Sequence, residues 1–251
     1  MIDIKDYGQI ALLQVRHGKA NALDTELCHE LMRCLEQLRI SHVRAVVIIG
    51  EGRIFSAGVD LLRVLSGGRA YLEQLLPVLR DMLRTVFFYS KPIIAAVNGH
   101  AIAGGCLLAC AGDKRVMVSN GARIGVTELV VGLPFPMIAM EIMRFVVASH
   151  RFSDVMCSGA TFPAEQGIDL GLVDEVVEVA KLTDRAMAAA EELASRSPSA
   201  FALTKEQIRR PVLERVQRNG PQFDAAVDAV WLAPDTLGKI GDYVSKTFKK
   251  P

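Results

Sequence analysis

Short segments that are apolar at almost every position alternate along this chain with longer segments whose apolar residues recur every three or four positions. The clearest short segments are 10–15, 44–49 and 92–97, which are rich in Val and Ile. A strand that is apolar on both faces must be covered on both sides, as happens in sheets that lie between layers of helices. The alternation therefore predicts an α/β protein.

The helical segments are recognised by their spacing. Leucines recur between Leu27 and Leu38 at intervals of four, four and three, which places them on one face of a helix that Asp24 or Thr25 can cap. Residues 69–88 have the same periodicity, and we expect a break or kink at Pro77 because proline lacks a backbone N–H.

The second half of the chain changes character. We expect a short strand at 115–118 and a late edge strand near 173–177, and from Lys181 onward three helical segments. The second of these is expected to start after a break at Gly220–Pro221, and its apolar face to contain Phe223, Ala226 and Val230; the third should contain Leu237, Ile240, Val244 and Phe248. No repeat or linker separates two units, so residues 1–190 should form one core and residues 191–251 a helical region that packs on it or on a neighbouring subunit.

Composition excludes several classes of function. The chain of 251 residues has 29 basic and 28 acidic residues, so nothing indicates a nucleic-acid surface. The longest apolar stretches are far shorter than the roughly 20 residues that cross a bilayer. The N-terminus has no targeting pattern, the C-terminus lacks a Ser-Lys-Leu address, and five cysteines form no CxxC pair, so we expect a cytoplasmic protein with reduced thiols. Cys106 and Cys110 are expected to pack in the core and not to bind a metal.

Two glycine-containing turns stand out. Residues 55–60 read FSAGVD, and residues 98–106 read NGHAIAGGC and lead from a strand into a helix. Glycine permits tight backbone conformations there, and the first amides of a helix have no partner within the helix. Such amides can hold an anion, although close packing alone also explains a glycine turn.

Five segments in a fixed order resemble the crotonase family of enoyl-CoA hydratases and isomerases. They are KANALD (19–24), FSAGVDL (55–61), KPIIAAVNGHAIAGGCLLA (91–109), ARIGVTELVVGLPFP (122–136) and FPAEQGIDLGLVDEVV (162–177). The resemblance implies an α/β spiral of ββα turns with a C-terminal helical oligomerisation region. It also implies assembly as a homotrimer or a dimer of trimers.

The same resemblance implies a substrate and a site. The ligand would be an acyl-CoA thioester, with no further cofactor and no metal, and its carbonyl would lie between the backbone amides of Val59 and Gly104. Fixed donors of this kind stabilise the negative charge of an enolate. Residues expected to contact CoA or the acyl group are Lys19, Ala20, Ala22, Ser56, Ala57, Asp60, Leu107, Leu133 and Phe135.

The two amides form an oxyanion hole, and the acidic and basic side chains around it distinguish the branches of the family. Hydratases that this chain resembles have two glutamates, and here Leu107 occupies the first position while Glu128 matches the second. Hydration needs paired acid and base groups, whereas one carboxylate suffices to move a double bond from C3 to C2. The sequence therefore favours a Δ3,Δ2-enoyl-CoA isomerase with Glu128 as the base. Apolar neighbours, namely Leu107, Leu129, Val130 and Val131, are expected to raise its pKa.

Several alternatives stay open. A hydratase would need a second acid, from Asp60 or Glu141, although Asp60 is expected to cap or brace its loop. His100 and Asp113 are interpreted as structural. Hydrolase or decarboxylase chemistry is compatible with a single glutamate beside an oxyanion hole. A CoA-thioester-binding protein without catalysis is a further alternative, which Leu107 supports and Glu128 argues against.

Overall fold

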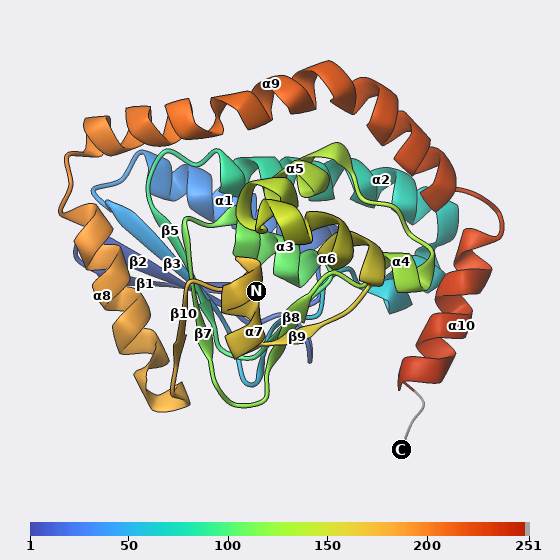
Figure 1. Cartoon of the computed structure of the whole chain (residues 1–251), viewed down its shortest axis with the longest axis horizontal. Coiled ribbons are helices and arrows are strands. Elements are labelled where there is room, and N and C mark those ends of the chain that lie inside the picture. Colours follow the sequence, from blue (N-terminus) through green and yellow to red (C-terminus); the bar gives the residue numbers. More distant parts are fainter. Residues whose placement is uncertain (249–251) are drawn as a thin grey trace.

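Four successive ββα units form the first half of the molecule. The structure, a computed structural model, describes residues 1–248 (Figure 1). The side chain of Phe248 and residues 249–251 lie outside the described part. The units are β1 (Ile2–Tyr7), β2 (Ile10–Val15) and α1 (Thr25–Arg39); β3 (Ala45–Gly50), β4 (Ile54–Ser56) and α2 (Leu61–Phe87); β5 (Ile93–Val97), β6 (His100–Ile102) and α3 (Gly104–Ala111); and β7 (Lys114–Val118), β8 (Arg123–Gly125) and α4 (Glu128–Val131).

The second half is mainly helical. It contains α5 (Met137–Val146), α6 (Phe152–Ser158), β9 (Phe162–Pro163), α7 (Ala164–Leu170), β10 (Glu175–Val177), α8 (Leu182–Ala194), α9 (Pro198–Trp231) and α10 (Thr236–Phe248), with short 3-10 turns at Ser149–Arg151 and Val179–Lys181. None of the helices in residues 1–248 is both long and apolar enough to cross a membrane.

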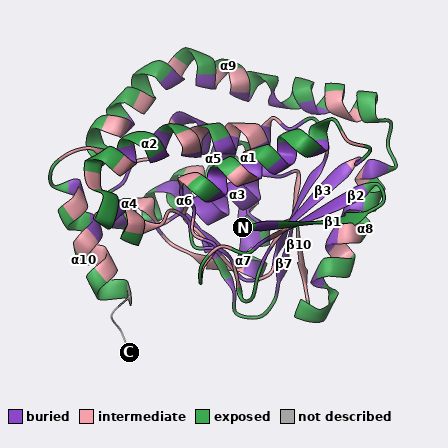
Figure 2. Ribbon diagram, turned by 180° about the vertical axis from the view of Figure 1, so that it is seen from behind, coloured by how far each residue is buried: buried purple, intermediate pink, exposed green. Residues whose placement is uncertain are grey.

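Two sheets arise because the two strands of the second, third and fourth units separate, whereas β1 and β2 pair with each other. From the second unit on, first strands join a six-stranded sheet in the order β1-β2-β3-β5-β7-β10, and second strands join a four-stranded sheet in the order β4-β6-β8-β9. Pairing in the large sheet is parallel except between β1 and β2. From the second unit on, each unit therefore adds one strand to each sheet, which confirms the predicted spiral of ββα turns. The central strands β3 and β5 of the large sheet are buried at every position except Ile49, and Figure 2 shows them in the interior.

Most of the predicted elements are present. β2 has the predicted bounds, α1 begins after Asp24, whose Oδ1 accepts a hydrogen bond of 2.8 Å from the Leu27 amide, and β10 is the predicted edge strand. The strand β1 was not predicted. Five of its six residues are exposed, so it lacks the apolar signal of the inner strands and is fixed by pairing with β2.

Two predicted helix breaks are wrong. In α2 the non-helical backbone lies at Gly68, with φ of 58°, and the helix continues through Pro77. α9 is one helix of 34 residues that includes both Pro211 and Pro221. A proline removes one helical hydrogen bond, and packing of the flanking turns against the core can outweigh that loss.

The apolar residues predicted for the last part of α9 do not pack on the core of the chain. Phe223 and Val230 are exposed, at 54% and 43%, whereas Val227 and Trp231 are buried. α9 crosses above α1, α5 and α2 in Figure 1, and its buried Lys205 and Arg209 contact Asp113 at 2.6 and 2.8 Å. Asp113 thus has the structural role expected of it. The predicted boundary between residues 190 and 191 falls inside α8.

Candidate active site

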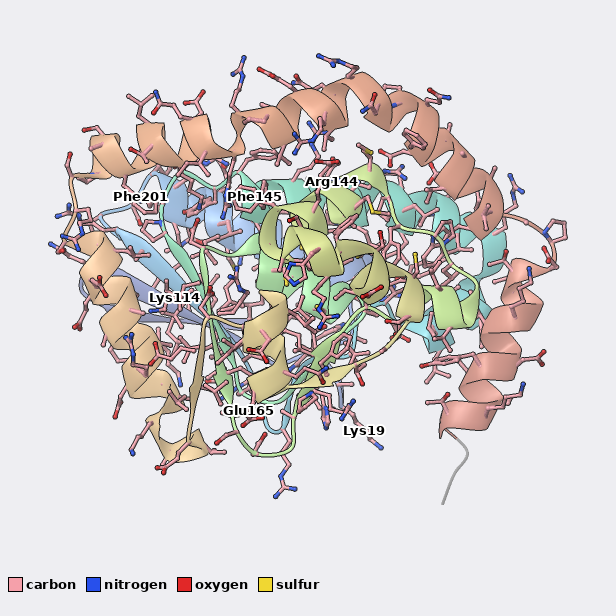
Figure 3. The ribbon with its side chains drawn as sticks, viewed as in Figure 1. Lys19, Lys114, Arg144, Phe145, Glu165 and Phe201 are labelled. Carbon is pink, nitrogen blue, oxygen red and sulfur yellow. The ribbon has the colours of Figure 1, made fainter. Side chains whose placement is uncertain are left out.

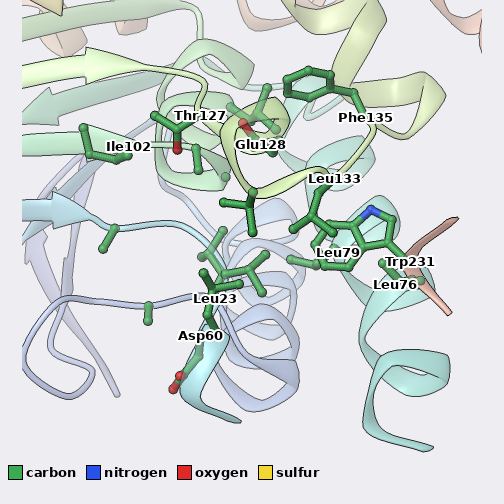
Figure 4. Close-up of a pocket in the computed structure, with 18 of the residues that line it drawn as sticks. Leu23, Asp60, Leu76, Leu79, Ile102, Thr127, Glu128, Leu133, Phe135 and Trp231 are labelled. Carbon is green, nitrogen blue, oxygen red and sulfur yellow. The ribbon is translucent and has the colours of Figure 1, made fainter. Parts of the chain in front are cut away.

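One cavity of about 600 Å³ lies where the turns that follow β4 and β6 approach α4 (Figure 4). Its floor is formed by the loop before α1 and by α2, and its opposite wall by residues 133–136 and the last turns of α9 and α10. The lining is predominantly apolar, with leucine the commonest residue. Few polar groups enter it, which is the usual composition of a small-molecule site.

The turn at residues 57–60 leaves one amide free. Gly58 has φ of 82°, a conformation that favours glycine. Val59 forms an isolated parallel β-bridge with Leu23, and the hydrogen bonds of this bridge are made by the two residues that flank Val59. The Leu23 amide donates to the Gly58 carbonyl at 2.7 Å, and the Asp60 amide donates to the Leu23 carbonyl at 3.0 Å. Because alternate amides of an extended chain point in opposite directions, the Val59 N–H is directed away from this bridge. Asp60 caps α2 by accepting from the Arg63 amide at 3.0 Å, as expected.

The turn at residues 103–105 presents the second amide. Ala103 adopts φ of 52° and ψ of −126°, and α3 begins at Gly104, whose N–H therefore has no partner within the helix. A Cβ atom added at Gly58 would lie 2.9 Å from the backbone nitrogen of Gly104. A Cβ atom added at Gly104 would lie 3.7 Å from the backbone nitrogen of Val59. The two turns are thus in contact. Within residues 1–248, no carbonyl accepts a hydrogen bond from either amide.

Glu128 is the first residue of α4 and lines the same cavity. The residue as a whole is half-buried, but its Oε2 is enclosed and has no hydrogen-bond partner within the described residues. Burial raises the pKa of Glu128 to about 7, and hydrogen bonding to backbone amides opposes this only in part. A carboxyl group with this pKa can accept and return a proton near neutral pH.

The cavity brings together nearly all of the predicted site residues. Glu128, Val59, Gly104, Lys19, Ala20, Ala22, Ala57, Asp60, Leu107, Leu133 and Phe135 line it. Lys19 lies at the solvent edge with its side chain directed outward, as Figure 3 shows. Ser56 does not line the cavity. It is 2% exposed, and its hydroxyl donates a hydrogen bond of 2.8 Å to the Asn21 carbonyl. Ser56 therefore links the turn after β4 to the loop before α1.

The residues that enclose Glu128 differ in part from those predicted. Leu129 and Val130 are exposed, at 43% and 59%, because the single turn of α4 directs them away from the cavity. Leu107 and Val131 are buried and line the cavity. Two of the four predicted neighbours therefore contribute to desolvation.

Other candidate acids lie elsewhere. Glu141 is 2% exposed and contacts Arg215 at 2.5 Å and Arg144 at 3.3 Å, outside the cavity. Among the described residues, Asp60 and Glu128 are the carboxylates that line it. His100 accepts a hydrogen bond from the Arg123 amide at 3.2 Å, which fits the structural interpretation.

The thiols of Cys106 and Cys110 are fully buried in α3, as predicted for core residues. A hydrogen bond between the two thiols, together with burial, raises the pKa of Cys106 well above its ordinary value. Neither cysteine lines the cavity.

Sequence reasoning missed several lining residues. His17 lines the mouth and contacts Asp24 at 2.7 Å, and Thr127 precedes the base. Trp231 of α9 and Tyr243 of α10 form part of the far wall. The one available signal was that Trp231 is the single tryptophan of the chain.

The spiral fold, the two contacting turns and the buried glutamate define a protein of the crotonase class. The family model for enoyl-CoA hydratase/isomerase matches residues 5–229. A Thermus thermophilus protein, provisionally named an enoyl-CoA hydratase, is 36% identical over 76% of this chain and 76% of its own length. This chain therefore belongs to the enoyl-CoA hydratase/isomerase family, whose members act on acyl-CoA thioesters.

Solved structures agree on the fold and differ in named activity. One Mycobacterium tuberculosis protein, 28% identical to this chain, has two solved structures. One is described as a probable enoyl-CoA hydratase and has a TM-score of 0.84, and the other is described as an enoyl-CoA isomerase and has a TM-score of 0.80. Each match covers 91% of this chain and 96% of the Mycobacterium chain. Human mitochondrial Δ3,Δ2-enoyl-CoA isomerase, at 22% identity, has a TM-score of 0.92 and covers 99% of this chain and 98% of its own. That last likeness concerns the fold alone.

Proposed function

We propose that this protein is a Δ3,Δ2-enoyl-CoA isomerase. The observation that carries the proposal is that one enclosed carboxyl group, Glu128, shares a cavity with the free amides of Val59 and Gly104, while Leu107 stands where a second acid would be needed. An isomerase needs one base and one anion-stabilising site, and a hydratase needs a further acid.

In the proposed mechanism the thioester oxygen accepts hydrogen bonds from the two turn amides. Glu128 removes a proton from C2 of the 3-enoyl group, and the electrons delocalise into a dienolate whose negative charge lies on the thioester oxygen. The protonated Glu128 then delivers the proton to C4, and the double bond moves to C2–C3. Each amide donor contributes about 10²–10³-fold to such a step. The chemistry uses groups of this chain only, so we propose that no resident cofactor is required.

Hydration is the nearest alternative, and the names of several relatives favour it. It would require a second acid in the cavity, where Asp60 is engaged as the cap of α2. A decarboxylase, the activity named for an Escherichia coli relative at 25% identity, would have to hold a substrate with a further carboxylate in this mainly apolar cavity. Arg80, a cation that lines the cavity, is already paired with Asp228 at 2.6 Å.

The test is turnover of a 3-enoyl-CoA and of a 2-enoyl-CoA by the purified protein, with Glu128→Gln in parallel. We expect conjugation of the 3-enoyl substrate, no hydration of the 2-enoyl substrate, and loss of activity in a folded Glu128→Gln variant. Hydration of the 2-enoyl substrate would overturn the isomerase proposal. Binding of both substrates without turnover of either would favour a non-catalytic CoA-thioester-binding protein.

We further propose that the chain assembles as a homotrimer or a dimer of trimers through its C-terminal helical region. The exposed Phe223 and Val230 on the outer face of α9 support a contact there, because large apolar side chains on one helix face favour burial. Sedimentation equilibrium of the wild type and of Phe223→Ser tests this assembly. A monomeric wild type would overturn it.

A further inference from the structure

The far wall of the cavity is built from the C-terminal helices. Val227 and Trp231 of α9 and Tyr243 of α10 line it together with leucines of α2. Figure 4 shows the Trp231 indole beside Leu76, Leu79 and Leu133, on the side of the cavity away from Leu23 and Asp60. A region expected to serve subunit contacts therefore also encloses the site.

The indole is held in a fixed position. Its Nε1 donates a hydrogen bond of 3.1 Å to the Pro134 carbonyl, and the side chain is 4% exposed. Asp228 accepts two hydrogen bonds from Arg80 of α2, at 2.6 and 3.1 Å, and Asp224 accepts from the Met137 amide at 2.7 Å. These contacts attach the end of α9 to α2 and to the start of α5, so Trp231 is a rigid boundary.

The direction of the acyl chain follows from the two ends of the cavity. Lys19 is exposed and cationic, which suits the charged CoA portion, so we infer that CoA leaves toward that end. With the thioester at the Val59 and Gly104 amides, the acyl chain then extends toward the opposite end. That end is lined by apolar side chains from three parts of the chain: Leu76, Leu79, Met82, Leu83, Leu133, Phe135 and Trp231.

We propose that Trp231 forms the end wall of the acyl chamber and sets the longest acyl chain that the protein accepts. The substrates are then uncharged acyl chains no longer than the distance to the indole allows. Each methylene that enters this apolar chamber should increase affinity by about fourfold, until the chain meets Trp231 and the gain stops. This inference rests on the proposed function only in taking an acyl-CoA as the ligand.

Trp231 is the single tryptophan of the chain, so its fluorescence tests the inference directly. The wild type is titrated with saturated acyl-CoAs from butanoyl-CoA to hexadecanoyl-CoA, which bind without a double bond to isomerise. We expect the emission to be unchanged by the shortest ligand and to change from one chain length onward, the length at which affinity also stops increasing. The inference would be overturned if butanoyl-CoA changed the Trp231 emission as much as the longer ligands do. It would also be overturned if affinity increased with chain length while the emission stayed the same for every ligand.

Variants separate a specificity role from a purely structural one. Trp231→Leu should increase kcat/KM for chains longer than the wild-type limit relative to shorter ones, whereas Ile208→Leu, at an exposed position of the same helix, should leave the chain-length profile unchanged. If Trp231→Leu lowers kcat/KM equally at every length, the indole is only structural. The fluorescence titration uses non-reacting ligands, so its outcome is independent of whether the protein is an isomerase.

Discussion

Replacing Glu128 by glutamine should make the protein more stable at alkaline pH while it removes activity. Burial raises the pKa of Glu128 from an ordinary 4.5 to about 7 in the folded protein. Between these values the folded state retains a proton that the unfolded chain has released, so the free energy of unfolding falls as pH rises. Above pH 7 the cost of the buried charge is fully present, and its magnitude is at most about 3 kcal/mol.

Glutamine has nearly the same shape as glutamate and carries no charge. Glu128→Gln should therefore match the wild type in stability near pH 4.5 and exceed it by up to about 3 kcal/mol at pH 8. Loss of the base should lower kcat by about 10²–10⁴-fold. Guanidinium unfolding of both proteins at the two pH values measures the difference. A variant that is less stable at pH 8, or a difference that does not change with pH, would refute an enclosed carboxylate at this position.

Three further predictions concern neighbouring positions. Leu107→Glu should introduce slow hydration of a 2-enoyl-CoA by supplying the missing acid, and Leu107→Gln should not; equal rates in the two variants would contradict this. Ala103→Gly should raise the free energy of unfolding by about 1 kcal/mol, because φ of 52° is strained for alanine, and an unchanged denaturation midpoint would argue against stored strain. Asp113→Asn should destabilise the protein by about 3–5 kcal/mol, since it weakens the pairing of the buried Lys205 and Arg209, and a thermal unfolding series would detect this.

The parts of the molecule with local signals were predictable from sequence. The inner strands are apolar on both faces, and α1 has both a periodic face and the capping Asp24. The glycine turns at Gly58 and Gly104 were recognised because their conformations restrict which residues fit. These features depend on neighbours in the chain, so local reasoning could find them. The spiral and the roles of the two turn amides were implied by the resemblance to the crotonase family and not by these local signals.

The remainder depends on tertiary contacts. Pro77 and Pro221 were expected to interrupt helices, yet both helices continue through them. The side-chain direction of Val130 depends on one short turn of helix that no periodicity marks. Trp231 reaches the cavity only because α9 folds back across the core, roughly 100 residues after Glu128 in the chain, and such long-range placement leaves no local pattern.

The most direct measurement of the proposed proton shuttle follows a label within the substrate. A 3-enoyl-CoA with both C2 hydrogens replaced by deuterium is converted in ordinary water, and the early 2-enoyl product is analysed by NMR. One deuterium stays at C2, and because Oε2 of Glu128 is shielded from solvent, the account predicts the other at C4 of the product and no conversion by Glu128→Gln. Product with no deuterium at C4, or full activity of Glu128→Gln, would contradict transfer by this single carboxyl group.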